Sequence, residues 1–501
     1  MARGVVALLA LSATGCAGNR EIWACPHALD LEPGPAAATA PASSLAPRYV
    51  VTVARILEEA RARSRAYERL RFLCDRIGNR LSGSENLDKA VAWAAETMRS
   101  DGLDEVRTEP VMVPKWVRGY ESVVLLTPWR KPLCALAIGN SEGGVLSSEA
   151  LGKGAFEGEV VVARDWAGLE ALGDRVKGKV VLFHHPMRPY EPGKDTGYGE
   201  SVDYRVNGAS RAAAKGAVAC LVCSATARSL GTPHTGALRY VDDAPKIPAA
   251  CLSPEDSAMI VRLVEAGETV RVAMALGSRF EDDVPSANVV GEIRGSERPE
   301  EVVVFGGHLD SWDVGQGAHD DGGPCVAAME AMRILRTLGL RPRRTIRVVL
   351  FTNEENGLRG GKAYAKDHEK ELEKHVAAIE ADSGAFRPLG FSTPAAPADA
   401  TPEEKARFDR IRARLREAVA LLAPVGAGTL GEGGGGADIG PMAPAGVPQI
   451  GLDVDMATYF DIHHTDADTF DKVVKEDLDL CAGVLGALVY VLADMPESLR
   501  E

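Results

Sequence analysis

Apolar runs alternate with amphipathic stretches through the second half of the chain, from residue 286 onward. The runs have the length of buried strands, and the stretches repeat apolar positions every three to four residues, as helices do. Strands are expected at 302–305, 345–351 and 376–380, and helices at 323–338, 360–366, 407–422 and 478–492. Strands alternating with helices predict an α/β fold, a three-layer sandwich whose largely parallel central sheet is covered by helices on both sides.

The pattern from Tyr49 onward is helical. Val53, Ile56 and Ala60 share one face, and another amphipathic stretch at 87–103 follows the polar loop 78–84. A strand is expected at 106–113. We interpret residues 48–125 as the N-terminal part of the same α/β domain, which continues at 286–497.

Residues 126–285 have a different character and are expected to form a β-rich insert. Short apolar strands at 158–162, 179–183 and 217–222 surround one Ala-rich helix at 208–215. Cys220 and Cys223 form a C-x-x-C, but strand alternation points their side chains to opposite faces, which favours buried structural cysteines over a metal or redox site. His184-His185 lacks an acidic partner at metal-ligand spacing and favours a loop role.

The first residues have the pattern of an export signal rather than of a fold. Arg3 precedes an apolar run at 5–11, and small residues then lead to Cys16. This resembles a bacterial lipoprotein signal at 1–16, cleaved before a cysteine that is then lipidated, although Ala13 stands where such signals usually have Leu. Residues 17–47 are rich in Ala, Pro and Ser and predict a flexible tether. The protein is expected to be exported, as a periplasmic or outer-membrane-anchored lipoprotein or, alternatively, as a secreted protein.

Length and charge limit the partners. The 501 residues exceed one ordinary core, so two or three domains are expected. The net charge of −14 and the lack of a Lys/Arg cluster disfavour nucleic acid. Contact with a membrane is expected only through a lipid anchor at Cys16, and a homodimer is left open.

The candidate chemistry begins where the first of these strands ends. His308 follows the strand and two glycines, and Asp310 is placed to accept the N–H of its imidazole, as carboxylates do behind metal-bound histidines. A glycine-flanked loop then delivers Asp320 and Asp321. Adjacent residues of a simple turn cannot both aim at one metal, so one should ligate or bridge and the other should turn away.

Acidic groups also follow the next strands. Glu354 and Glu355 come directly after a buried strand, and Asp382 follows another, while His463-His464 lies in a loop near the C-terminus. Buried acids are costly without a counter-charge, which metal cations would supply. The carboxyl ends of parallel strands meet at one edge of a sheet. The sequence therefore predicts a metal site that activates water, as in a hydrolase.

These motifs resemble those of the zinc exopeptidases with two co-catalytic metals, the aminopeptidase and transferrin-receptor-like family. The matching segments are GGHLD, GAHDDGG, TNEENGLRG, EADSG and HHTDAD, and within the family they are closest to the dipeptidase branch. The resemblance covers most of the chain from Tyr49 to Leu492, and residues 126–285 resemble the protease-associated domain inserted in several exopeptidases.

Carried over position by position, the resemblance implies two zinc ions (Zn²⁺) per chain. Asp320 would bridge them, His308 and Asp382 would complete one site, and Glu355 and His464 the other. Glu354 would be the general base, and Asp310 would orient His308.

The expected activity is the hydrolysis of short peptides with a free N-terminus, by an aminopeptidase or a dipeptidase; a carboxypeptidase remains open. Tyr459 and His463 are candidate donors to the oxyanion or contacts to the substrate, and the glycine run 431–436 with Asp438 is expected to shape the cleft. Two other classes share the fold. A single-zinc acyltransferase of the glutaminyl cyclase kind is disfavoured by the full ligand set, and a non-catalytic binding protein would need missing ligands.

Overall fold

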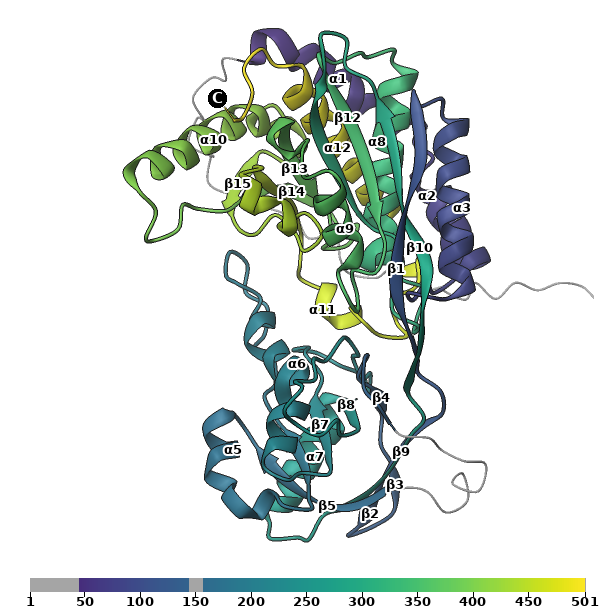
Figure 1. Cartoon of the computed structure of the whole chain (residues 1–501), viewed down its shortest axis with the longest axis vertical. Helices are drawn as coiled ribbons and strands as arrows, with labels where there is room; N and C mark the ends of the chain where they lie inside the picture. Colours follow the sequence, from purple (N-terminus) through teal and green to yellow (C-terminus); the bar gives the residue numbers. More distant parts are fainter. Residues whose placement is uncertain (1–44, 144–155, 501) are drawn as a thin grey trace, which may run out of the picture. The chain divides into compact units, whose positions relative to one another are not determined.

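The strands expected in the second half of the chain belong to a mixed eight-stranded sheet. The computed structural model describes residues 45–143 and 156–500, and the strand order of this sheet is β1–β10–β12–β11–β13–β16–β14–β15 (Figure 1). Its strands are β1 Glu105–Val117, β10 Arg279–Ile293, β11 Arg298–His308, β12 Arg344–Phe351, β13 His375–Glu380, β14 Pro388–Thr393, β15 Thr429–Glu432 and β16 Gln449–Val454. The central strands β12, β11, β13 and β16 run parallel, and β10 and β14 join them antiparallel. The predicted mixed, largely parallel sheet is confirmed.

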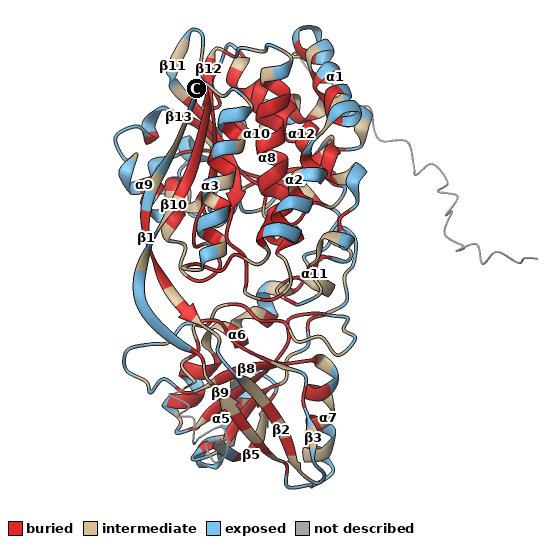
Figure 2. Ribbon diagram, turned by 90° about the vertical axis from the view of Figure 1, so that its right-hand side faces the viewer, coloured by how far each residue is buried: buried red, intermediate tan, exposed pale blue. Residues whose placement is uncertain are grey.

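Helices cover both faces of this sheet, as the alternation along β11 requires. Val303 and Phe305 belong to one hydrophobic cluster, whereas Val302 and Val304 belong to another on the opposite face. The first cluster includes residues of α1 Ala46–Arg63, α2 Ala66–Phe72, α3 Glu85–Ser100, α8 Gly323–Thr337, α10 Pro402–Ala420 and α12 Lys475–Asp494; the second includes α9 Arg359–Asp367. In Figure 2 α8 and α12 are red along most of their length, because they are packed between the sheet and the outer helices. The three-layer sandwich is therefore confirmed.

A second eight-stranded sheet lies within residues 121–276, with the order β3–β2–β9–β5–β6–β7–β8–β4. Its strands are β2 Glu121–Thr127, β3 Lys131–Pro132, β4 Ala135–Ala137, β5 Phe156–Ala163, β6 Val180–Phe183, β7 Ala219–Cys223, β8 Ala249–Leu252 and β9 Arg271–Leu276. The expectation of a single helix here was wrong, since α5 Trp166–Leu172, α6 Tyr198–Ala214 and α7 Pro254–Glu265 pack on it. α5 has only seven residues and no full amphipathic repeat, so periodicity misses it. The likeness to a protease-associated domain and the domain boundaries stay predictions.

The cysteine pair behaves as the alternation of β7 predicts. Cys220 joins the cluster beneath α6, whereas its neighbour Leu221 joins the cluster on the other face. Cys220 and Cys223 are both buried and free. His184 Nδ1 lies 2.8 Å from the Ser257 hydroxyl, and His185 contacts the Arg164 carbonyl, so neither faces an acidic cluster.

The ends of the parallel strands place the candidate residues at one edge of the first sheet. β11 ends at His308, β12 ends at Phe351 just before Glu354, and β13 ends two residues before Asp382. The predicted signal at 1–16, Cys16 and most of the tether lie outside the described residues, and α1 already begins at Ala46. Within 45–143 and 156–500, no helix is long and apolar enough to cross a membrane.

Candidate metal centre

The structure brings all five predicted ligands together. His308 Nε2 lies 3.3 Å from Asp382 Oδ1 and 3.4 Å from Asp320 Oδ1. His464 Nε2 lies 3.1 Å from both Asp320 Oδ2 and Glu355 Oε2. Four chain segments, separated by as much as 156 residues between His308 and His464, thus converge on Asp320.

The imidazole tautomers show that these contacts join acceptors to acceptors. His308 Nδ1 lies 3.0 Å from the Asp310 carbonyl oxygen and His464 Nδ1 lies 3.2 Å from the Thr235 carbonyl oxygen, so in the neutral rings the Nδ1–H groups donate there. The Nε2 lone pairs then face carboxylate oxygens, and Asp320 Oδ2 and Glu355 Oε1 are buried without a hydrogen-bond partner. Converging acceptors of this kind, with each ring fixed from behind, suit divalent cations.

Two sets of ligand atoms share Asp320. His308, Asp320 and Asp382 form one set, and Asp320, His463 and His464 form the other, with all atoms of a set within 4.8 Å of one another. His463 stacks on His464 at a ring distance of 3.5 Å, and its Nε2 lies 3.6 Å from Asp320 Oδ2, so it competes with the predicted ligand Glu355 for the second position. His464 has a backbone φ of 60°, a conformation that only a tightly constrained non-glycine residue keeps.

The crowded acids have shifted pKa values. Burial, and then the nearby Asp320 charge, raises the pKa of Glu355 to about 7. Burial also raises the pKa of Glu354 well above its usual range. For Asp320 burial acts in the same direction, but its contacts with His308 and His464 outweigh burial and hold its pKa well below the usual range. A positive charge would therefore stabilise the ionised acids of this cluster. Groups with strongly shifted pKa values are often found at functional sites.

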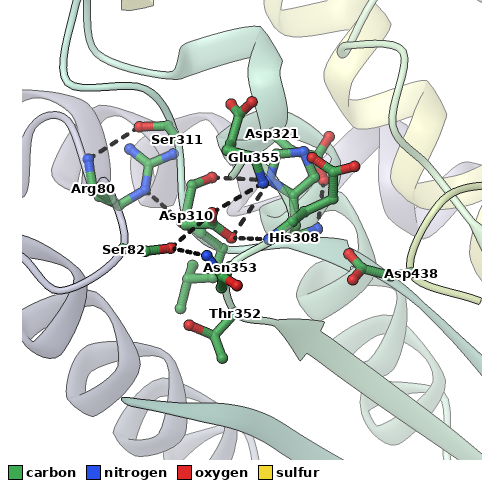
Figure 3. A network of polar contacts seen from close by, with 12 residues as sticks. Arg80, Ser82, His308, Asp310, Ser311, Asp321, Thr352, Asn353, Glu355 and Asp438 are labelled. Atoms are coloured by element: carbon green, nitrogen blue, oxygen red, sulfur yellow. Dashed lines mark hydrogen bonds and ion pairs between the residues drawn. The ribbon is translucent and has the colours of Figure 1, made fainter. Parts of the chain in front are cut away.

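Asp310 contacts the imidazole through its backbone carbonyl and not, as predicted, through its carboxylate. Its carboxylate Oδ1 is 3.8 Å from His308 Nδ1, beyond hydrogen-bond distance, because the Asp310 carbonyl occupies that place. The carboxylate instead accepts the backbone N–H of Glu354 at 3.0 Å. It also accepts the backbone N–H of Glu355 at 3.3 Å, and Figure 3 shows Asp310 beside Glu355. The Asp310 carboxylate thus fixes the turn that carries the two glutamates, while the Asp310 carbonyl fixes the ring.

Asp320 and Asp321 point apart, as expected for neighbours. Asp321 Oδ2 accepts the backbone N–H of His308 at 3.0 Å, whereas Asp320 faces the imidazoles. His319, just before them, stacks on Phe386 at 4.0 Å and accepts an N–H from Ala385. Only Asp320 of this run faces the ligands.

Two residues that sequence reasoning gave no role hold the Asp320 loop. Asp468 accepts the backbone N–H groups of His319 at 2.8 Å and Asp320 at 3.0 Å. Arg80 is fully buried and donates to the carbonyls of Leu309, Gly78, Gln316 and Gly317 at 2.8 to 3.0 Å. Asp468 stands in the HHTDAD motif, but Arg80 belongs to a distant polar loop and carries no local signal.

Sequence reasoning also missed Glu380, which pairs with the previously named Asp438 in a buried acidic contact near the site. Glu380 accepts the backbone N–H groups of Asp438 and Ile439, and burial raises its pKa to about 7. Both carboxylate oxygens of Asp438 are buried without a hydrogen-bond partner among the described residues. Burial raises the pKa of Asp438 well above its usual range, with Glu380 and Glu354 adding to the shift. The pair therefore adds buried acidic groups close to Glu354.

The acidic cluster opens into a cavity of about 320 Å³. Glu354, Asp382, Tyr459 and His463 line it, together with residues of the second sheet's region, Tyr198, Arg205, Val206 and Ala237. Burial and the surrounding acids raise the pKa of Tyr459 well above its usual range, so its hydroxyl keeps its proton. The glycine run 431–436 and Asp438 do not belong to this lining, and their expected role in shaping the substrate cleft stays a prediction.

Comparison with known proteins shows which family the chain belongs to. The model of peptidase family M28 matches residues 288–489. Carboxypeptidase Q of Xenopus laevis is 40% identical over 88% of this chain and 88% of its own length, and that of Homo sapiens is 38% identical over 88% and 87%. The chain belongs to peptidase family M28. This confirms the predicted resemblance to the carboxypeptidase Q-like dipeptidases, and the protein is a hydrolase of the metallo-exopeptidase class.

Solved structures agree with the family fold. A peptidase M28 precursor from Shewanella amazonensis SB2B is 33% identical, with a TM-score of 0.83 over 90% of this chain and 98% of that one. An aminopeptidase from Aneurinibacillus sp. strain AM-1 has a TM-score of 0.61 over 90% of this chain and 98% of its own, at 21% identity, and shares the fold. The match to the Shewanella amazonensis structure spans 90% of this chain and therefore extends into the segment that forms the second sheet.

Proposed function

We propose that this M28 peptidase is a zinc-dependent exopeptidase that hydrolyses short peptides with a free N-terminus, acting as an aminopeptidase or a dipeptidase with two metals per chain. The observation that carries the proposal is the pair of ligand sets that share Asp320. One carboxylate between two histidine-containing sets is the donor arrangement expected of a bridged two-metal site.

The residues divide the work as follows. Asp320 would bridge the two ions, His308 and Asp382 would hold one, and Glu355 and His464 the other. Zinc held there would lower the pKa of a shared water and polarise the scissile carbonyl. Glu354, which faces the cavity without ligating, accepts the proton of the attacking water and delivers it to the leaving amine.

Tyr459 and His463 are the side chains placed to act on the reacting carbonyl. Both line the cavity beside Asp320 and Glu354, and their rings pack at 5.0 Å. The protonated Tyr459 hydroxyl is a donor, as an oxyanion contact requires. We assign the donor role to Tyr459 and leave to His463 a position beside the second metal, where it stacks on His464.

The substrate class follows from the relatives and from the size of the cavity. Carboxypeptidase Q proteins resemble this chain along most of its length, and a zinc aminopeptidase of Bacillus subtilis shares its fold. A cavity of about 320 Å³, closed partly by Tyr198 and Arg205, admits a chain end rather than a folded protein. Short peptides, and dipeptides above all, are the proposed substrates.

Glu354→Gln tests the proposal. The amide fills the same space but accepts no proton, so the purified variant should keep two zinc ions and lose at least 10²-fold in kcat on a free dipeptide, the scale of general acid–base catalysis. Asp320→Ala should lose zinc as well, and Glu369→Gln, an exposed glutamate of the same region, should match the wild type. One zinc per fully active chain would favour the cyclase-like acyltransferase, and metal binding without hydrolysis would favour a binding protein.

We also propose export by the signal at 1–16, with a lipid on Cys16. Fractionation of expressing cells and the mass of the mature N-terminus test it. The Cys16→Ala variant should leave the membrane fraction if the lipid anchors the protein.

A further inference from the structure

Arg205 is a buried cation in the cavity, and within residues 45–143 and 156–500 it forms no ion pair with an acid. It lies on α6, is only 7% exposed and lines the same cavity as Glu354 and Asp382. Its Nη1 donates to the Thr235 carbonyl at 3.0 Å and its Nη2 to the Tyr198 hydroxyl at 2.8 Å, both neutral acceptors. Among the described residues, its buried Nε–H has no hydrogen-bond partner and no carboxylate forms an ion pair with it. Burying such a charge is costly unless an anion joins it.

The chain is built to hold this guanidinium in place. A Cβ on Gly236 would lie 2.2 Å from Arg205 Cζ, so only glycine leaves room for the group. Gly236 also has a φ of +130°, which other residues rarely adopt. The Tyr198 ring lies on another side, 5.6 Å from Cζ. The guanidinium is therefore held by Tyr198 of its own helix and by the segment that contains Thr235 and Gly236.

The Arg205 guanidinium lies directly behind the predicted metal ligand His464. Arg205 Nη1 is 3.5 Å from His464 Nδ1, and because both atoms donate to the Thr235 carbonyl they are neighbours rather than partners. An anionic group of a substrate bound to Arg205 would thus lie only a few atoms from a substrate carbonyl placed near His464 Nε2. In a dipeptide two atoms separate the scissile carbonyl carbon from the carboxylate carbon, whereas each further residue adds about 3.5 Å.

We propose that Arg205 binds the C-terminal carboxylate of the substrate and so makes the site selective for dipeptides. The inference rests on the proposed exopeptidase function and names its specificity-determining residue. Arg205 is the only Lys or Arg among the residues that line the cavity. The free carboxylate supplies the anion that the protein does not, through charge-assisted hydrogen bonds, which Arg can make in pairs.

The competing explanation is that Arg205 only offsets the acidic ligands. In that case the loss of Arg205 would change the hydrolysis of every substrate alike. Carboxylate binding predicts instead a change that depends on the substrate's C-terminus. The ratio of kcat/KM for a free dipeptide to that for its C-terminal amide separates the two, and it does not depend on the active fraction of a preparation.

The experiment uses the zinc-loaded full chain with Leu-Leu, Leu-Leu amide and Leu-Leu-Leu. The wild type should prefer Leu-Leu over both others, and Arg205→Gln should reduce the acid-to-amide ratio about 10- to 100-fold, the range of hydrogen bonds to charged groups. Arg205→Lys, which keeps the charge, should restore part of the ratio, and Gly236→Ala, which displaces the guanidinium, should lower it. Arg211→Gln is the matched control, since Arg211 lies on the same helix but packs on Trp166.

Two outcomes would overturn the inference while the exopeptidase function stands. One is a wild type that cleaves the amide as fast as the acid, and the other is an Arg205→Gln ratio equal to that of the wild type. A zinc-loaded wild type that cleaves none of the three peptides would instead contradict the proposed function itself. Zinc content and circular dichroism of each variant show that the comparison is made on folded protein.

Discussion

Arg80→Met is expected to weaken both the fold and the metal site, because one buried guanidinium holds two loops together. Its four side-chain hydrogen bonds reach Leu309 and Gly78 on one side and Gln316 and Gly317 on the other, at 2.8 to 3.0 Å. Gln316 and Gly317 precede the proposed bridging ligand Asp320. Methionine fills a similar space but donates no hydrogen bond.

The magnitude follows from these four contacts. Hydrogen bonds to a charged group contribute about 1.5–3 kcal/mol each, so the gross loss is about 6–12 kcal/mol. The substitution also removes the desolvation cost of a buried charge, several kcal/mol, since Arg80 has only carbonyl partners. A net loss of about 3–5 kcal/mol remains. With an unfolding entropy near 2.1 cal/mol/K per residue, a chain of roughly 450 residues would unfold about 3–5 °C earlier.

Calorimetry of the zinc-loaded protein measures the loss, and metal analysis shows whether zinc goes with it. Arg80→Met should bind fewer than two zinc ions at a concentration that saturates the wild type. Arg76→Met, an exposed arginine four residues earlier, should behave like the wild type. An Arg80→Met protein with full zinc content and a loss below about 1 kcal/mol would refute the reasoning, because the loop would then hold Asp320 without the guanidinium.

Three further predictions concern other residues in and around the site. Asp310→Asn should lower kcat at least 10-fold by placing a donor against the Glu354 and Glu355 N–H groups, while the His308 tautomer, read by imidazole ¹⁵N NMR, stays as in the wild type; a changed tautomer would contradict the assignment. Thr235→Ala keeps the carbonyl that faces His464, so it should lose only about 1 kcal/mol with its hydroxyl bond to Ala137 and retain zinc; loss of zinc would count against this. The free energy of unfolding of the metal-free protein should fall as the pH rises from about 5 to 8. Glu355 and Glu380 have pKa values raised to about 7, so they bind more protons in the folded than in the unfolded state in this range. Denaturant titrations in which the free energy of unfolding rises with pH would contradict this prediction.

The sequence predicted the parts of the site that follow strands. His308, Glu354 and Asp382 each come after a strong apolar run, and parallel strands must bring their ends together. The parts it did not predict come from distant segments. Arg80 lies 229 residues before Leu309, and Thr235 lies 229 residues before His464. Their contacts use backbone carbonyls, which every residue has, so no residue type marks them.

The prediction of the helices within residues 121–276 failed for a different reason. The Ala-rich run predicted at 208–215 is only the second half of α6, whose first half contains Tyr198 and Arg205. Polar and aromatic residues there disturb the apolar repeat because they face the cavity rather than a core. The residues of α6 that line the cavity therefore obscure its apolar periodicity, as expected where the needs of a site conflict with the local sequence pattern.

Both proposed histidine ligands owe their orientation to main-chain carbonyls. His308 is held by Asp310 of its own loop, but His464 is held by Thr235, whose backbone N–H also bonds the His464 carbonyl at 3.0 Å. The same Thr235 carbonyl seats Arg205. One peptide group of the second sheet's segment thus fixes a proposed metal ligand and the proposed carboxylate-binding residue together. On the proposed function, a displacement of the Thr235 carbonyl would therefore disturb metal binding and substrate selection together.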